Sequence, residues 1–222
     1  TSQRLPYPEL EPSPNMNRKH FLLAGLSATV LGISACSKND DKSKATPSAT
    51  GSSSKGDKPR RTVSLDIVAS EAKGFTAGSM MSAIVAYVFF DPQCPHCGQL
   101  WNASLPLQKK VRFVWIPVGL MNPTSSAQGA TLLSAVDPVK AMGEHEVSLL
   151  AKQGGIGTSS GVTDEAKQAV ASNTALFNNL GLEGVPFTIV KNARTGQTAT
   201  GGGSMETAAL AQLIGVDARS PR

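Results

Sequence analysis

Residues 84–97 of this chain read IVAYVFFDPQCPHC. The first half, Ile84 to Phe90, is an uninterrupted apolar run rich in β-branched and aromatic residues, which predicts a strand buried on both faces. The second half carries two cysteines, Cys94 and Cys97, where we expect a helix to begin. A thiol at a helix start meets unpaired backbone N–H groups and the positive end of the helix dipole, and both stabilise a thiolate. The stretch therefore predicts a reactive dithiol at a strand–helix junction.

The four residues from Cys94 to Cys97 have separate expected roles in thiol–disulfide exchange. Cys94 is nearest the helix N-terminus and is the expected nucleophile, exposed to its substrate, whereas Cys97 lies one turn inward and is the expected buried resolving thiol. Pro95 presets a helical φ and supplies no N–H. A protonated His96 beside the thiolate would lower its pKa further. A more stable thiolate makes the disulfide easier to reduce and therefore a better oxidant.

Two other interpretations of the cysteine pair are a disulfide that only closes a tight loop and half of a zinc or copper site. Zinc takes about four ligands, and after Cys36 the chain offers His96 and His145 but no second cysteine pair. We therefore predict no bound metal and no cofactor. His145, flanked by Glu144 and Glu146 on an expected helix, is interpreted as a surface or packing residue.

Composition predicts one globular domain preceded by a long polar segment. Of the 222 residues, 40% are hydrophobic and 17% are charged, and the formal net charge is +5. Much of the basic excess lies in the first 61 residues, so the clustered basic face of a nucleic-acid binder is not indicated. Residues 62–222 are long enough for one domain of about 150 residues.

The segment that precedes this domain begins like a bacterial export signal. Residues 1–15 contain four prolines and are interpreted as a non-native upstream extension. Residues 16–35 combine a basic start, an apolar run from Phe21 to Ile33 that is too short to span a bilayer, and small residues at the end. They predict a signal peptide.

The end of that signal resembles the lipobox of bacterial lipoproteins. The residues Ile33-Ser34-Ala35 precede Cys36, which the resemblance implies is acylated. Residues 36–61 are then the lipidated cysteine and a polar, disordered linker. The sequence predicts a protein tethered on the periplasmic side of a bacterial membrane, with the inner and outer membranes not distinguished.

Within residues 62–222, alternating periodicities predict an α/β fold. We expect strands over 62–68, 84–90, 111–118, 187–191 and 197–200, and helices over 94–107, 132–136, 139–152, 163–180 and 205–214. This order predicts a thioredoxin-like fold with an inserted helical subdomain between the second central strand and the C-terminal hairpin.

A second motif, Val185-Pro186, comes just before the expected hairpin. In thioredoxin-like folds a cis-proline at this place faces the active-site sulfurs, and the backbone of the preceding residue pairs with an extended substrate. Because cis bonds are only about 5–6% of X–Pro bonds, the position of Pro186 in the predicted fold carries this expectation.

Together these motifs resemble the catalytic domain of the periplasmic thiol:disulfide interchange family of DsbG and DsbC, and DsbG more closely. The matching residues are 89–97, Trp101, Ile116-Pro117-Val118-Gly119, Asp137-Pro138, Asn173-Thr174 and Val185-Pro186, and the resemblance covers roughly 62–215. It implies Cys94 as attacking thiol, Cys97 as resolving thiol and Pro186 as the cis-proline. It also implies exported proteins with thiols or disulfides as substrates, and a membrane redox partner that resets the pair.

Three features depart from that family. Only the linker and about twenty residues precede the central strand, where DsbG and DsbC carry a dimerisation domain, so we expect a monomer. The Cys-Pro-His-Cys tetrapeptide and Val185 before the proline are similar to DsbA, a dithiol oxidase. Val88 stands where thioredoxin and DsbA place a buried acid, so deprotonation of Cys97 needs water or another group.

The sequence therefore predicts a membrane-tethered periplasmic thiol:disulfide oxidoreductase, with oxidation of substrate dithiols slightly favoured. A disulfide isomerase or reductase of the DsbG type, including one that reduces oxidised single cysteines, is the first alternative. A lipoprotein that binds peptides or copper is the second.

Overall fold

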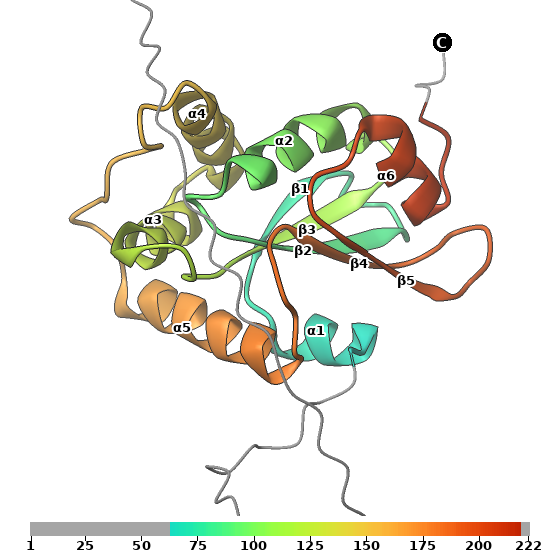
Figure 1. The fold of residues 1–222 in the computed structure, drawn as a ribbon, viewed down its shortest axis with the longest axis horizontal. Helices are drawn as coiled ribbons and strands as arrows, with labels where there is room; N and C mark the ends of the chain where they lie inside the picture. Colours follow the sequence, from blue (N-terminus) through green and yellow to red (C-terminus); the bar gives the residue numbers. More distant parts are fainter. Residues whose placement is uncertain (1–62, 219–222) are drawn as a thin grey trace, which may run out of the picture. The chain divides into compact units, whose positions relative to one another are not determined.

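The computed structural model of the chain describes residues 63–218, in which one five-stranded mixed sheet lies between two layers of helices (Figure 1). The strand order is β1-β3-β2-β4-β5, with β2 and β3 parallel and the other neighbouring pairs antiparallel. The strands are β1 (Phe75–Gly78), β2 (Val85–Phe90), β3 (Arg112–Pro117), β4 (Phe187–Lys191) and β5 (Thr198–Gly202).

The central strand β2 is buried on both faces, as its continuous apolar sequence predicts. Phe90 faces one side of the sheet and packs edge-on against Trp115 of β3, with ring centroids 5.7 Å apart. Phe89 faces the other side and packs against Phe177, also at 5.7 Å. Side chains alternate along a strand, so one apolar run supplies both halves of the core.

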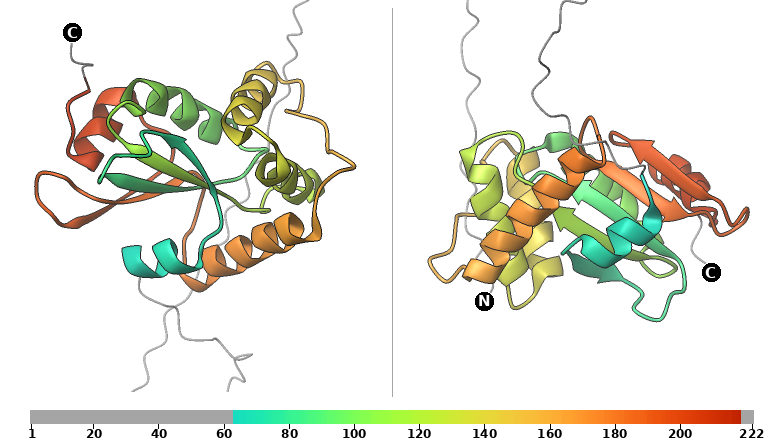
Figure 2. Two further views of the ribbon diagram at one scale, coloured as in Figure 1. Left: turned by 180° about the vertical axis from the view of Figure 1, so that it is seen from behind. Right: turned by 90° about the horizontal axis from the view of Figure 1, so that it is seen from below.

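Helices cover each face of the sheet, and Figure 2 shows the two layers from behind and from below. The first face carries α2, α4 and α6, and the second carries α1 and α5; α3 packs against α4 and α5. The helices are α1 (Leu65–Glu71), α2 (Pro95–Ser104), α3 (Pro123–Ser134), α4 (Pro138–Leu150), α5 (Asp164–Asn179) and α6 (Thr207–Ile214), and a 3-10 turn, Leu105–Leu107, follows α2.

The predicted strand over 62–68 is wrong, because α1 begins within this segment, at Leu65, and the first strand is β1. Its apolar residues alternate, but they are also spaced as one stripe of a helix. Val68 is buried in the core on the second face of the sheet, and the partly buried Leu65 and Ala72 pack against that core. Residues three or four positions apart lie on the same side of a helix. The same apolar residues therefore fit a strand or a helix, and tertiary packing decides between the two.

The predicted helix over 132–136 is wrong in extent, because α3 begins nine residues earlier, at Pro123, and ends at Ser134. Asn122 caps this helix: its Oδ1 accepts hydrogen bonds from the backbone N–H of Thr124 and Ser125 at 2.8 and 3.3 Å. Ser125 Oγ in turn accepts the N–H of Asn122, which completes a capping box. The first turn is rich in polar residues and has the composition of a loop, so the sequence pattern did not predict the start of the helix.

Strand β1 was not predicted, and the remaining helices and strands lie within a few residues of their predicted bounds. Three helices, α3 to α5, enter between β3 and β4, and they form the predicted helical insertion. The fold is the expected α/β, thioredoxin-like arrangement. No helix in residues 63–218 is both long enough and apolar enough to cross a bilayer.

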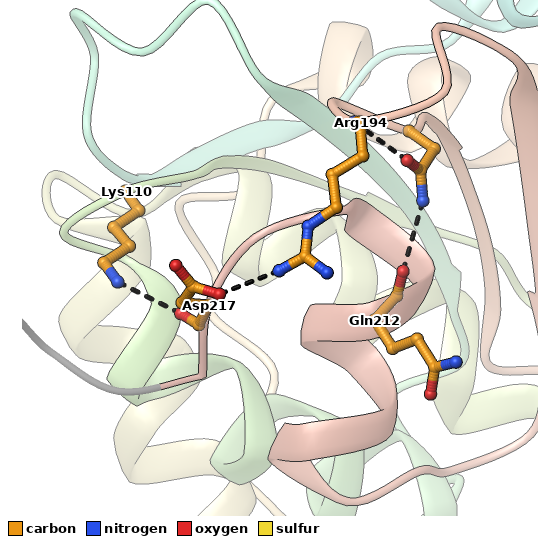
Figure 3. Close-up of polar contacts among 5 residues, drawn as sticks. Lys110, Arg194, Gln212 and Asp217 are labelled. Atoms are coloured by element: carbon orange, nitrogen blue, oxygen red, sulfur yellow. Dashed lines mark hydrogen bonds and ion pairs between the residues drawn. The ribbon is translucent and has the colours of Figure 1, made fainter.

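Polar contacts join the end of the described chain to the β4–β5 hairpin (Figure 3). The Arg194 guanidinium binds Asp217 Oδ1 at 2.8 Å, and Lys110 Nζ donates to the backbone carbonyl of Asp217 at 3.1 Å. Asn192 Nδ2 donates to the carbonyl of Gln212 in α6 at 3.1 Å. Exposed ion pairs contribute about 0–1 kcal/mol, so these contacts fix the path of the chain after α6 more than they stabilise the fold.

Candidate active site

The two cysteines lie at the junction of β2 and α2, as predicted. Cys94 is the N-cap residue of α2, with extended φ and ψ of −96° and 109°, and Pro95 occupies the first turn. The Cys97 N–H donates to the Cys94 carbonyl at 2.9 Å. Both thiols are free. Cys97 is fully buried, as expected. The expectation that Cys94 is exposed is wrong: the residue is only 4% exposed, because its sulfur lies against the backbone carbonyl of Val185.

The surroundings of the two thiols shift their pKa values in opposite directions. The pKa of Cys94 is lowered from 9.0 to about 6, chiefly by a hydrogen bond from the Cys97 side chain. Burial opposes this shift, while the backbone N–H groups of Cys97 and His96 and the charge of His96 assist it. Burial first, and then its interactions with Cys94, raise the pKa of Cys97 well above 9.0. Cys94 is therefore the thiolate of the pair at neutral pH.

His96 lies on the exposed side of the first turn of α2. Its Nδ1 is 3.0 Å from Gln99 Oε1 and 3.4 Å from Ser204 Oγ. Its charge is the smallest of the named contributions to the Cys94 pKa. The Cys94 thiolate is stabilised mainly by hydrogen-bond donors at the start of the helix, and the Cys97 thiol contributes most.

The Val185-Pro186 segment lies against the nucleophile. The Val185–Pro186 peptide bond is cis, and the Val185 carbonyl lies 3.6 Å from Cys94 Sγ, where it accepts a hydrogen bond from the thiol when Cys94 is protonated. These residues are 91 positions apart in sequence. They meet because β4, which begins directly after Pro186, pairs antiparallel with β2 in a register that places Phe187 opposite Phe89.

Asp91 holds the loops around the dithiol, a role that the sequence reasoning did not assign to it. The side chain is fully buried. Its Oδ1 accepts the N–H of Gln93 at 2.8 Å, and its Oδ2 accepts the N–H groups of Leu120 and Met121 at 2.7 and 2.9 Å. One carboxyl thereby ties the turn before Cys94 to the loop after β3. An Asp-Pro pair after a strand signals such a turn, but the partners come from a distant loop.

The inserted helices contact the same turn. His145 of α4 is fully buried, so it is a packing residue and not a surface one. Its Nε2 lies 2.6 Å from the Pro92 carbonyl, and its Nδ1 accepts the Ile156 N–H at 3.1 Å. This arrangement places the proton on Nε2, and burial lowers the pKa of the ring, which keeps it neutral.

Gln128 of α3 connects the turn to the loop after α4. Its Oε1 accepts a hydrogen bond from Gln93 Nε2, and its own Nε2 donates to the carbonyls of Gly154 and Ile156 at 2.8 and 2.7 Å. The active-site turn therefore rests on side chains of both α3 and α4.

Glu146, the neighbour of His145, is the other buried titratable residue of α4. It is 1% exposed, and neither of its carboxyl oxygens has a hydrogen-bond partner within residues 63–218. Burial first, and then the charge of Cys94, raise its pKa from 4.5 to about 8. Sequence reasoning named Glu146 only as a neighbour of His145, because nothing local marks it as buried.

Two other expectations concern metals and the lipid anchor. Within residues 63–218, no three side chains of His, Cys, Asp or Glu are grouped so that they could hold a metal ion. Cys36 and the segments 1–15, 16–35 and 36–61 lie outside the described residues.

Comparison with solved structures identifies the fold class. The catalytic domain of Proteus mirabilis ScsC superposes with a TM-score of 0.54 at 18% sequence identity, covering 67% of this chain and 91% of that domain. A thioredoxin-like oxidoreductase from Silicibacter pomeroyi superposes with a TM-score of 0.51 at 20% identity, covering 68% of this chain and 96% of that chain. The described domain therefore has a thioredoxin-like α/β fold. No protein-family model matches the chain.

Two curated proteins are similar to the chain in sequence, and both are thiol:disulfide interchange proteins named DsbG. The DsbG of Pseudomonas aeruginosa is 29% identical over 133 residues, which are 59% of this chain and 51% of that protein. The DsbG of Escherichia coli K12 is 31% identical over 114 residues, 49% of this chain and 44% of that protein. The chain thus matches about half the length of these relatives, in agreement with the resemblance to DsbG.

Proposed function

We propose that this chain is a thiol:disulfide oxidoreductase that exchanges disulfides with protein substrates through Cys94 and Cys97. The observation that carries the proposal is the placement of the pair: Cys94 caps α2 beside the Val185 carbonyl, and Cys97 is buried one turn inward. This placement lowers the pKa of Cys94 to about 6 and raises that of Cys97 well above 9.0. The first thiol is a ready nucleophile and leaving group, while the second stays protonated until it is needed. This is the division of roles that exchange requires.

Oxidation of a substrate dithiol would use this asymmetry in two steps. A substrate thiolate attacks Cys94 Sγ of the oxidised pair, the bond to Cys97 breaks, and Cys97 takes a proton. A second substrate thiolate then attacks the substrate sulfur of the mixed disulfide, and Cys94 leaves as its stabilised thiolate. The substrate dithiol is oxidised to a disulfide, and the Cys94–Cys97 pair accepts the two electrons. A good leaving group favours this direction.

The surface beside the dithiol fits an extended or unfolded polypeptide. Leu120 and Met121, in the loop held by Asp91, are exposed apolar residues. Val185 places a backbone carbonyl beside Cys94. Apolar contacts combined with backbone pairing are a common way to bind peptides without strict sequence requirements. We infer that the substrates are exported proteins and that a membrane redox partner, of unknown identity, resets the pair.

Isomerisation or reduction is the second candidate, and it is favoured by the similarity to two proteins named DsbG. The equilibrium of the Cys94–Cys97 pair with glutathione distinguishes an oxidase from a reductase. A reduction potential near −120 mV, that of DsbA, is expected for an oxidase, and one near −270 mV, that of thioredoxin, for a reductase.

Trapping tests the exchange function itself. Cys97→Ser should accumulate mixed disulfides with exported proteins through Cys94, because no resolving thiol remains. Cys94→Ser should accumulate none while still binding unfolded peptide. If Cys97→Ser traps no protein although peptide binding persists, the chain is a binding module and the exchange function is refuted.

The N-terminal pattern supports a location on the periplasmic side of a bacterial membrane, attached through a lipid on Cys36. In this proposal residues 16–35 are the signal peptide, 36–61 the tether and 62–222 the monomeric catalytic domain. Cys36→Ser should abolish incorporation of labelled fatty acid and release the protein from membranes. Unchanged labelling of the Cys36→Ser protein would refute the anchor.

A further inference from the structure

Glu146 is buried in a place where its carboxyl has no structural partner. Both of its oxygens are inaccessible and lack a hydrogen-bond donor within residues 63–218. A carboxyl in such a place is costly to ionise, and natural cores rarely keep one without a reason. The mechanism described above does not use this group.

The carboxyl of Glu146 lies directly over the backbone of the active-site helix. A Cβ built on Gly98, the residue after Cys97, would overlap Glu146 Oε2 and lie 3.2 Å from its Cδ. Helices α2 and α4 pack closely here, and the missing side chain at position 98 makes room for the carboxyl.

Thiols of α2 dominate the electrostatic surroundings of Glu146. The charge of Cys94 helps to raise the pKa of Glu146, and the charge of Glu146 helps to raise that of Cys97. Besides Cys97, the titratable residue of α2 is His96, which is exposed. The other elements that pack extensively on α4, which are α3 and β1, contain no titratable residue. The buried Asp91, in the turn before Cys94, acts on the neighbouring His145. On α4 itself, the ring of the adjacent His145 is engaged by Pro92 and Ile156.

Building on the exchange function proposed above, we propose that Glu146 accepts the proton of the Cys97 thiol when the mixed disulfide is resolved and returns it in the reverse step. The sequence predicts that such a group is needed, because Val88 in β2 stands where thioredoxin and DsbA have a buried acid. In the reduced structure Glu146 makes no direct hydrogen bond to Cys97. The proton therefore passes through one water molecule or after a small side-chain movement.

The step balances without any further reactant. The Glu146 carboxylate takes the proton from Cys97, the resulting thiolate attacks Cys94 Sγ, and the bond between Cys94 and the substrate sulfur breaks. The substrate leaves as a thiolate, the Cys94–Cys97 disulfide forms, and Glu146 is left protonated. In the oxidase direction, the departing Cys97 thiolate takes the proton back from Glu146.

The charge of Cys94 affects when Glu146 can accept this proton. In the reduced pair, burial first and then the Cys94 thiolate raise the pKa of Glu146 to about 8, so the carboxyl is mostly protonated at pH 7. Formation of the mixed disulfide makes Cys94 neutral and removes that contribution, so the pKa of Glu146 falls. Burial still raises the pKa, but the carboxylate forms more readily in the mixed disulfide, when Cys97 has to lose its proton, than in the reduced pair.

Glu146→Gln tests the proposal, because it keeps the shape of the side chain and removes the proton acceptor. The full chain, carrying Cys36→Ser so that only two thiols remain, is reduced and mixed with oxidised glutathione. Acid-quenched samples are analysed by mass spectrometry, which separates the glutathione mixed disulfide from the internal disulfide. Glu144→Gln is the matched control: it lies on the same helix, but its side chain is 63% exposed.

At pH 7 we expect Glu146→Gln to slow resolution of the mixed disulfide by about 100-fold, at the lower end of general-base effects, while the initial attack by Cys94 is unchanged. The rise of the wild-type resolution rate with pH, through the titration of Glu146, should disappear in this variant. Glu146→Asp should retain that rise, and Glu144→Gln should behave as wild type.

Two results would overturn the role of Glu146. One is a Glu146→Gln protein that resolves the mixed disulfide at the wild-type rate with the wild-type pH profile. The other is equal slowing of both steps in Glu146→Gln and Glu146→Asp, which would indicate a purely structural effect. A wild-type protein that forms no mixed disulfide at Cys94 would instead refute the exchange function.

Discussion

Replacing Cys97 by alanine should raise the pKa of Cys94 more than any other single change in the motif. The hydrogen bond from the Cys97 side chain is the largest cause of the lowered Cys94 pKa, and burial acts against it. Cys97→Ala removes that bond and keeps the backbone N–H groups of His96 and residue 97. The pKa of Cys94 should therefore rise from about 6 towards its ordinary value of 9.0.

The expected change is large enough to measure directly. With a pKa of about 6, Cys94 is about nine-tenths ionised at pH 7, whereas a pKa of 9.0 would leave about one hundredth ionised. The readout is the midpoint of the thiolate absorbance during a pH titration, in a Cys36→Ser background. Alkylation rates alone would understate the effect, because a thiolate of higher pKa is intrinsically more nucleophilic.

Cys97→Ser supplies the matched control, since its hydroxyl can still donate to the Cys94 thiolate. Its midpoint should lie below that of Cys97→Ala. If Cys97→Ala still titrates near pH 6, the side-chain hydrogen bond is not the main cause, and the explanation based on it fails.

Three further predictions concern charge and stability. His96→Ala should move the Cys94 midpoint less than Cys97→Ala does, because the His96 charge is the smallest named contribution; an equal shift in the same absorbance titration would contradict this. Asp91→Asn should lower the free energy of unfolding in urea by about 1–3 kcal/mol, because it weakens a charged acceptor of three backbone N–H groups; an unchanged urea midpoint would count against it. Because the folded protein raises the Glu146 pKa from 4.5 to about 8, this group lowers stability progressively as the pH rises between those values. Reduced Glu146→Gln should therefore gain stability relative to wild type from pH 5 to pH 8, by a few kcal/mol (about 1.4 kcal/mol per pKa unit at most), and a constant difference in urea unfolding would argue against it.

The sequence was most informative where the determinants of structure are adjacent in the chain. Residues 84–97 contain the apolar strand, the turn and the start of the helix in one run, so the position of Cys94 and Cys97 at a strand–helix junction follows from local rules. The thioredoxin-like order then located Val185 and Pro186 beside them.

Other features depend on contacts that no local pattern encodes. The segment that forms α1 fits both a strand and a helix, and only its packing against the second face of the sheet decides. Asp91 acts through N–H groups some thirty residues away. Glu146 has no sequence signal at all, because its burial and its proximity to Cys97 result from the packing of α4 on α2 and from the absence of a side chain at Gly98.

The contacts of His145 and Gln128 have a consequence for engineering the protein. The inserted helices of a thioredoxin-like domain are an obvious segment to exchange when such a protein is engineered. In this chain the insertion holds the Pro92-Gln93 turn through contacts of His145 with the Pro92 carbonyl and of Gln128 with the Gln93 amide. A chimera that receives a foreign insertion would have to receive a matching turn with it. The motif and the inserted helices are therefore one module, and they should be transplanted together.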